Sequence, residues 1–424
     1  MTTIHKRKQY AVGQGFFHTG ELCTDADVHL RYVVDCGATV DTFLELFNCI
    51  RRYLQTLSSE DQLDVLFITH AHFDHLSGVK SLLQTLKVET IVLPLIHVAD
   101  RLYAYARALD AGDVGSLAGF YEEFIADPIA TVAGLGPRRI ILIESSDGGG
   151  APFSREGDDG GRGPDGFGDD GRDLPYKTKI IGHGNARRSH TGSRVPVLIV
   201  PDSMALANNS AYHRWLLAPY VDSAIASQRT AFVTALATQL GFSSVQALEQ
   251  KLEDPSYITT LLTVKTEREK LKAAYKSLTT DLNITSLCVY SGPARNTQQL
   301  QMVHYGKFGV WRVGPSVNNK KIAWLGTGDA ALSDNTRYSA FKSHYGQLLP
   351  TVLTLALPHH GSAVGFNPNL VTDIEPNFYV AAASMQYGTH PGPTVVHAVA
   401  AAGRFLSVVN ASQTSEVDET VELG

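Results

Sequence analysis

The sequence predicts a layered α/β protein that carries a mostly helical insertion. Short apolar runs with the spacing of strands alternate with runs in which apolar residues recur at helical spacing. This alternation predicts a strand that ends at Asp35, a helix over 40–57, a strand over 63–69, a helix over 79–86 and a strand over 89–95. Strands and helices that follow one another in this way pack as sheets covered by helices.

The middle of the chain differs from both ends. Residues 147–173 are rich in Gly, Asp, Arg and Pro and have almost no apolar side chains, so we expect a surface loop there. Residues 174–282 contain one strand candidate, 195–200, and then apolar residues at helical intervals from about 203 onward. We therefore expect 1–146 and 283–424 to be two halves of one domain, with a mostly helical insertion at 174–282. Strand candidates resume in the second half at 286–290, 321–325, 352–357 and 378–382.

Composition excludes several classes of protein. With 44% hydrophobic and 18% charged residues the chain resembles a globular protein, and a net charge of -6 gives no overall signature of nucleic-acid binding. A local basic groove is still compatible with that average. We find no continuous apolar stretch of the length typical of a signal peptide near residue 1 or of a membrane-spanning segment later, so we expect no membrane association. The four cysteines show no CxxC pair, which argues against a disulfide framework and against a cysteine zinc site, and we expect a cytoplasmic location.

Four side chains that bind metals occupy six residues at the end of the strand over 63–69. They are His70, His72, Asp74 and His75. Imidazole nitrogens and a carboxylate oxygen suit Zn²⁺ and also accommodate Mn²⁺ or Fe. A single histidine at such a place is usually a surface or core residue, but this spacing favours a metal centre.

The motif His70-x-His72-x-Asp74-His75 resembles that of the metallo-β-lactamase superfamily. This resemblance implies a four-layer αββα sandwich, two divalent cations (Zn or Mn) and hydrolysis by metal-activated water. It also implies that Asp329, in Gly326-Thr-Gly-Asp329, bridges the two cations. Asp74 would bind metal and orient the attacking hydroxide. His359, His360 and His390 would supply later ligands, with His360 or His390 alternatively donating a proton to the leaving oxygen. Asp35 resembles the position that hydrogen-bonds a metal-binding histidine, although a simple turn residue would look the same.

Several further segments resemble the hydrolase domain of bacterial DNA-internalisation competence proteins. They are Val12-Gly-Gln-Gly15, Val34-Asp-Cys-Gly37, Asn283-x-x-Ser286-Leu287, Gly328-Asp329, Pro358-His-His-Gly-Ser362 and His390-Pro391. This similarity implies phosphodiester hydrolysis on DNA, RNA or a nucleotide.

Two features of the site stay open at this point. The superfamily's third histidine has no clear counterpart, because the candidates His183, His190 and His304 do not follow a clear strand, and His97 comes too early in the chain. The first cation is then held partly by water or by a carboxylate. The sequence also does not decide whether His359 or His360 coordinates metal.

Two other functions compete with phosphodiester hydrolysis. The fold also hosts enzymes that cleave small acyl substrates such as lactones and thioesters, for which a narrow apolar pocket rather than a basic groove is expected. A non-enzymatic alternative is a metal-bound module that binds a protein partner through the helical insertion. Against it, the motifs supply more hard ligands than a closed structural zinc site needs.

Overall fold

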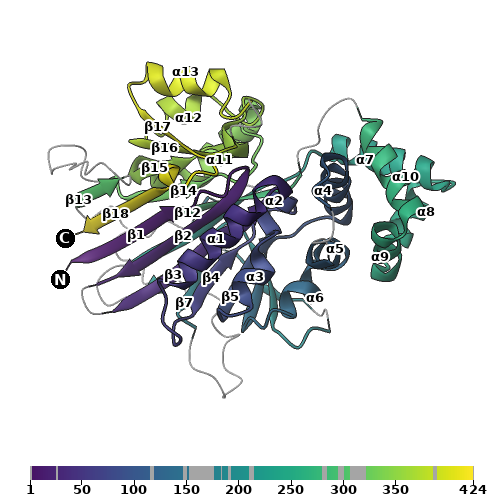
Figure 1. Ribbon diagram of the computed structural model, residues 1–424, viewed down its shortest axis with the longest axis horizontal. Helices are drawn as coiled ribbons and strands as arrows, with labels where there is room; N and C mark the ends of the chain where they lie inside the picture. The colour runs from purple at the N-terminus through teal and green to yellow at the C-terminus, as the bar shows by residue number, and fades with distance from the viewer. Residues whose placement is uncertain are drawn as a thin grey trace.

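The computed structural model describes residues 2–24, 27–114, 119–146, 150–151, 176–182, 184–189, 192–209, 214–278, 284–294, 300–305, 321–384 and 389–423. Two β-sheets form the centre, with helices lying against both (Figure 1). Apart from 150–151, the predicted surface loop at 147–173 lies outside the described residues, as do His183, His190 and Asn283.

The first sheet contains strands from both ends of the chain. Its order is β13, β18, β1, β2, β3, β4, β5, β6, β9, β8. Neighbouring strands are antiparallel from β13 to β3 and parallel from β3 through β6 to β9. The strand bounds are β1 Thr3–Gln9, β2 Gly15–Cys23, β3 Val28–Ala38, β4 Leu63–Phe67, β5 Val88–Pro94, β6 Arg139–Glu144, β8 Arg187–Arg188, β9 Val197–Pro201, β13 Leu300–Tyr305 and β18 Val417–Leu423.

The second sheet has the order β17, β16, β15, β14, β12, β11, β10, β7. Its strands β17 to β14 are parallel neighbours, and those from β14 to β7 are antiparallel. The bounds are β7 Thr178–Gly182, β10 Met204–Asn209, β11 Arg214–Asp222, β12 Ser286–Pro293, β14 Ala323–Gly326, β15 Val352–Ala356, β16 Phe378–Ala382 and β17 Phe405–Val409.

Three hydrophobic cores define four layers. One core packs the outer face of the first sheet against helices, a second lies between the sheets, and a third packs the second sheet against its own helices. The helices on the first sheet are α1 Phe43–Leu54, α2 Phe73–Leu76, α3 Val79–Leu83, α4 Val98–Ala111, α5 Gly119–Ala126 and α6 Pro128–Ala133. Those on the second are α11 Asn335–Tyr345, α12 Asn369–Thr372 and α13 Pro393–Ala401. This arrangement confirms the predicted αββα sandwich.

Four more helices extend the outer layer of the first sheet. They are α7 Ala226–Leu240, α8 Val245–Lys251, α9 Pro255–Thr263 and α10 Lys265–Lys276, and they lie beside α4 and α5 (Figure 1). Their buried side chains, such as Phe232 and Leu271, belong to the same core as Leu46 of α1. Among the described residues, no single helix is long and apolar enough to cross a membrane; α7 and α8 reach that length only as a pair bent by 86°.

The expectation of helices from about 203 onward was wrong for the first 20 residues. The described residues of this stretch form β10 and β11, which are interior strands of the second sheet. Both faces of these strands are covered, so Trp215 to Asp222 are all buried and the sequence has no alternation of apolar and polar residues. A continuous apolar run of this kind does not distinguish a buried strand from a helix.

The strand pairing decides where loops meet. β3 and β4 run parallel with Val34 opposite Phe67, so the turn at Asp35 and the segment 68–72 leave the sheet side by side. In the second sheet, Gly326 of β14 lies opposite Ala356 of β15, and Ala356 lies opposite Val380 of β16. The carboxyl ends of parallel strands in both sheets therefore supply the loops of one site.

A polar cluster interrupts the core between the sheets. Arg7 of β1 forms a buried ion pair with Glu419 of β18 at 2.9 Å. His5 lies 3.1 Å from the Tyr32 hydroxyl, and His18 stacks on Trp324 with 4.0 Å between ring centroids. Both nitrogens of His18 are buried without a hydrogen-bond partner among the described residues. Burial, together with the positive charge of Arg7, lowers the pKa of His18 well below its usual value.

We predict that His18→Phe reduces the acid sensitivity of folding. The folded protein keeps His18 neutral, whereas the unfolded chain takes up a proton as pH falls below about 6.5, so wild type loses stability on acidification. Phenylalanine preserves the stacked ring and does not titrate. Between pH 7 and pH 5 the variant should lose up to about 2 kcal/mol less of its free energy of unfolding than wild type.

Urea unfolding of the metal-free proteins at both pH values measures this difference. The control is His304→Phe, because the His304 side chain is 39% exposed and lies outside the core. An identical pH dependence in wild type and His18→Phe would show that His18 does not contribute to acid unfolding.

Candidate metal centre

The histidine cluster follows β4 and continues into the short helix α2. His70 lies between these elements, His72 is the residue that precedes α2, and Asp74 and His75 are within the helix. All three histidines are buried, and Asp74 is partly buried. The strand end and the helical turn therefore direct four ligand-type side chains to one edge of the first sheet.

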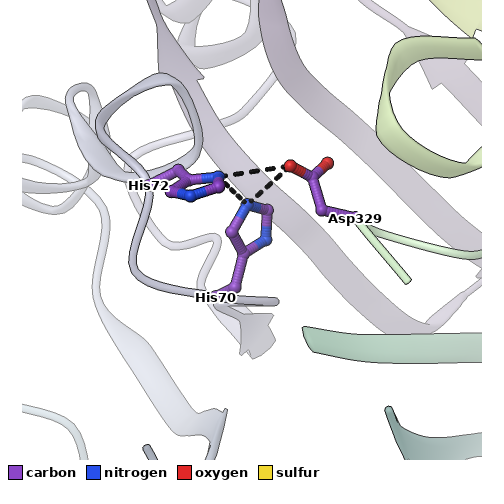
Figure 2. Close-up of side chains that lie close together, drawn as sticks. All are labelled: His70, His72 and Asp329. Carbon is purple, nitrogen blue, oxygen red and sulfur yellow. Dashed lines mark hydrogen bonds and ion pairs between the residues drawn. The ribbon is translucent and has the colours of Figure 1, made fainter. Parts of the chain in front are cut away.

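The first ligand group consists of His70, His72 and Asp329 (Figure 2). His70 Nε2 lies 3.0 Å from His72 Nδ1, and Asp329 Oδ2 lies 3.3 Å and 3.2 Å from these two nitrogens. Asp329 follows β14, so this group joins the two sheets. Three ligand atoms at these separations can share one cation.

The second ligand group consists of Asp74, His75 and His360. His360 Nε2 lies 3.2 Å from Asp74 Oδ2, and its Nδ1 donates to the Ala382 carbonyl at 2.7 Å, which leaves Nε2 with a lone pair. The other carboxylate oxygen of Asp329, Oδ1, lies 3.7 Å from His75 Nε2. Asp329 thus has one oxygen at each ligand group.

The donor set fits divalent cations. His75 Nε2 and Asp329 Oδ1 are buried, face each other and have no hydrogen-bond partner among the described residues. Buried polar atoms normally have a partner, and a cation between these two would supply it. Burial also lowers the pKa of His70 and, with the charge of Arg107, lowers the pKa of His72 to about 3. Both rings are therefore neutral and able to bind metal at neutral pH.

His75 behaves differently in the absence of metal. Burial acts to lower its pKa, but the charge and hydrogen bond of Asp35 outweigh burial, and with Asp74 and Asp329 they raise the pKa of His75 to about 9. A cation that binds at Nε2 must displace this proton.

Asp35 hydrogen-bonds a histidine of the cluster, which is one of the two roles that the sequence left open. Its Oδ2 accepts from His75 Nδ1 at 2.7 Å and from the Thr69 hydroxyl at 2.6 Å, while Oδ1 accepts from Thr69 N at 2.7 Å. The Thr69 oxygen also lies 2.9 Å from His70 Nδ1, and it can accept there because its own proton goes to Asp35. The buried carboxylate therefore orients His75 directly and His70 through Thr69, leaving both Nε2 atoms for metal.

Two glycines of the sequence motifs explain how close α2 lies to the sheet. A Cβ on Gly37 would be 2.6 Å from the backbone of Asp74 and His75, and one on Gly15 would be 2.9 Å from the Asp74 carbonyl oxygen. Gly15 also has a φ of 146°. Only glycine fits at these positions while α2 keeps its place.

The Ser286 motif positions Asp329. Ser286 Oγ accepts from Asp329 N at 2.9 Å, and Leu287 N donates to the Thr69 carbonyl at 2.9 Å. Gly328, with a φ of 50°, lies against Ser286 so closely that a Cβ would be 2.7 Å from Ser286 Oγ. The first residues of β12 thus connect the loops of both sheets.

The backbone directs the side chains of the two adjacent histidines to different places. His359 and His360 both have positive φ values, 48° and 56°, which are uncommon for residues other than glycine and cluster at functional sites. His360 points into the second ligand group, whereas His359 Nε2 lies 3.9 Å from Asp329 Oδ2, on the side of the first group. His390 lies beyond His359, with parallel rings and 6.0 Å between centroids, and is in neither ligand group.

Two of the other histidine candidates, His304 and His97, lie away from the centre, while His183 and His190 are outside the described residues. His304 lies on β13 and is 3.8 Å from Glu422 at the edge of the first sheet. His97 precedes α4, where its Nδ1 accepts from Ala99 N. Among the described residues, the first ligand group contains two histidines and Asp329, and no third histidine joins them.

Sequence reasoning missed Arg107. This residue of α4 is partly buried, and its Nη1 lies 3.3 Å from His72 Nε2. No motif contains it; only its place within an otherwise apolar helix, Leu102 to Ala108, sets it apart.

Comparison with known families agrees with this geometry. Residues 30–187 match the metallo-beta-lactamase superfamily. The matched region contains the cluster from His70 to His75, whereas Asp329 and His360 lie outside it, so the structure adds the second half of the centre. Members of this superfamily are mostly metal-dependent hydrolases. No curated protein matches the chain.

We predict that Asp35→Asn weakens metal binding by roughly 10- to 100-fold. Asparagine retains the size of the side chain but presents an amide donor to groups that already donate. His75 and His70 then lose the partner that fixes their orientation. Competition with a chromophoric chelator measures the affinity for Zn²⁺.

Asp41→Asn serves as the control for this measurement, because it removes the same charge from an exposed position. Unchanged Zn²⁺ affinity in a folded Asp35→Asn protein would mean that the carboxylate is not needed to orient the ligands.

Proposed function

We propose that this protein is a binuclear metal-dependent hydrolase that cleaves phosphodiester bonds in DNA, RNA or a nucleotide. The observation that carries the proposal is the position of Asp329, whose two oxygens lie against two separate ligand groups. A shared carboxylate between two groups of histidine and aspartate ligands is suited to a pair of cations, Zn²⁺ or Mn²⁺.

The residues around the pair have distinct roles in this proposal. Cations held there would lower the pKa of a water molecule and neutralise charge that develops on the substrate oxygens. His70, His72, Asp74, His75 and His360 hold the pair together with Asp329. Of the two roles that we considered for His360, its Nδ1 bond to Ala382 and the approach of its Nε2 to Asp74 support the ligand role.

We assign the proton for the leaving oxygen to His390. Its ring is partly buried beside His359, and its Nδ1 lies 3.1 Å from the Thr389 hydroxyl, so Nε2 is the atom left for the substrate. Burial lowers the pKa of His390, which makes its protonated form a stronger acid. The ring of His359 is parallel to that of His390, and its Nε2 lies 3.9 Å from Asp329 Oδ2.

The choice of a phosphodiester over an acyl substrate rests on two observations. The Pro-His-His-Gly-Ser and Asn-x-x-Ser-Leu motifs resemble those of the competence-protein hydrolase domain. Arg107 adds a positive charge at the first ligand group, where an anionic substrate would gain from it. We further propose a cytoplasmic location, which the low cysteine count supports. In the alternative function, helices α7 to α10 bind a protein partner.

We predict about two metal ions per chain after reconstitution with Zn²⁺ or Mn²⁺. Each of the two ligand groups supplies three ligand atoms of its own. Each group can therefore hold one cation. Elemental analysis of dialysed protein gives the stoichiometry. A preparation that binds no metal, or only one ion at excess metal, would contradict the binuclear centre.

We predict that Asp74→Ala and His75→Ala abolish turnover while the protein stays folded. Both side chains belong to the second ligand group, and α2 is only four residues long, so the buried strand β4 is left intact. The loss should be roughly a thousandfold or more in rate. Wild type, both variants and the exposed control Asp41→Ala would be compared on single-stranded DNA, double-stranded DNA, RNA and cyclic nucleotides with Mn²⁺ and Zn²⁺.

Circular dichroism checks that the variants fold. Equal cleavage by folded variants would point to a contaminating nuclease and remove the centre from the mechanism. Wild-type activity on acyl esters alone would retain the metal centre and replace the phosphodiester substrate. A protein that binds two metals but cleaves none of these substrates would favour the partner-binding module.

A further inference from the structure

Arg107 lies where a substrate would meet the first ligand group. It comes from α4, an element of the helical layer, and reaches the outer nitrogen of His72 at 3.3 Å. Its charge acts on His72 of the first ligand group and on the nearby His359 and His390. A guanidinium at this place is partly shielded from water, and its interactions with anions are therefore stronger than on an open surface.

The orientation of His72 makes this contact unusual. His72 presents Nδ1 to His70 and Asp329, so Nδ1 is the nitrogen that would bind metal. A neutral imidazole that binds metal through Nδ1 carries its proton on Nε2. The atom that faces Arg107 Nη1 is then an N–H donor, and a guanidinium has only donors. Two donors 3.3 Å apart do not bond to each other, but both can donate to one oxygen placed beside them.

We propose that Arg107 and His72 Nε2–H together bind an anionic oxygen of the substrate, and that this pair selects a phosphodiester over an uncharged acyl group. The inference rests on the proposed hydrolytic function and names the residues of the same site that select its substrate class. Arg107 also interacts with other groups of the chain, and it need not be otherwise unpaired for this role. A guanidinium suits this task because its planar donors match phosphate oxygens.

The test uses the metal-loaded protein and inorganic phosphate as the probe. Wild type, Arg107→Gln and Arg107→Lys are compared by isothermal titration calorimetry at equal metal content, with Arg51→Gln as control because Arg51 is exposed on α1. We expect Arg107→Gln to weaken phosphate binding by roughly ten- to a hundredfold, Arg107→Lys to recover part of the loss, and the control to match wild type.

Metal affinity separates this role from a structural one. Arg107→Gln should bind Zn²⁺ at least as tightly as wild type, because a positive charge beside His72 is removed. On bis(p-nitrophenyl) phosphate its KM should rise by a factor similar to the loss in phosphate affinity. Phosphate affinity within twofold of wild type in Arg107→Gln, at full metal content, would overturn the proposal, and so would equal weakening by Arg51→Gln.

Failure of the proposed function gives a different result. If wild type cleaves acyl esters and not phosphodiesters, the assignment to phosphodiesters falls, and with it the selection of substrate by Arg107 and His72. The phosphate titration still decides separately whether this pair binds an anion. A loss of metal from Arg107→Gln that Arg107→Lys does not restore would make Arg107 a structural support of His72 and overturn its role in substrate binding.

Discussion

The metal centre depends on one buried carboxylate, that of Asp35. It accepts hydrogen bonds from Thr69 N, the Thr69 hydroxyl and His75 Nδ1. Burying a carboxylate away from water costs free energy unless hydrogen-bond donors surround it. The same hydrogen bonds that stabilise Asp35 therefore fix the positions of Thr69 and His75. Because the Thr69 oxygen also faces His70 Nδ1, Asp35 determines which nitrogen of His70 and which nitrogen of His75 faces a ligand group.

The second sheet is tied to this arrangement through backbone groups. Leu287 N donates to the Thr69 carbonyl, and the adjacent Ser286 hydroxyl accepts from Asp329 N. A line of hydrogen bonds therefore runs from Asp35 to Asp329 across the interface between the two sheets. This connection explains why a carboxylate from one sheet can divide its two oxygens between histidines of the other. The geometry of the ligand groups depends on the packing of the two sheets as much as on the ligand side chains.

The sequence contained most of the centre, but not all of it. The cluster 70–75 was predictable because its ligands lie on one strand end, where spacing alone brings them together. The choice between His359 and His360 was not, because it depends on two consecutive left-handed backbone conformations that no residue pattern encodes. Arg107 carries no motif, and its role follows only from the distance between α4 and His72. The strands within 203–222 escaped prediction because burial on both faces removes the alternation that identifies a strand.

His72 and Asp329 are 257 residues apart in the chain, and this separation determines when the centre can exist. The amino-terminal half of a chain emerges from the ribosome first, so the histidine cluster is synthesised long before Asp329, which contacts both ligand groups. Closing a loop of this length costs on the order of 5 kcal/mol in entropy, which the closing of the sandwich must offset. A nascent or truncated chain that lacks Asp329 therefore offers cations only the ligands of the cluster 70–75, and the two ligand groups are complete only in the fully synthesised and folded chain.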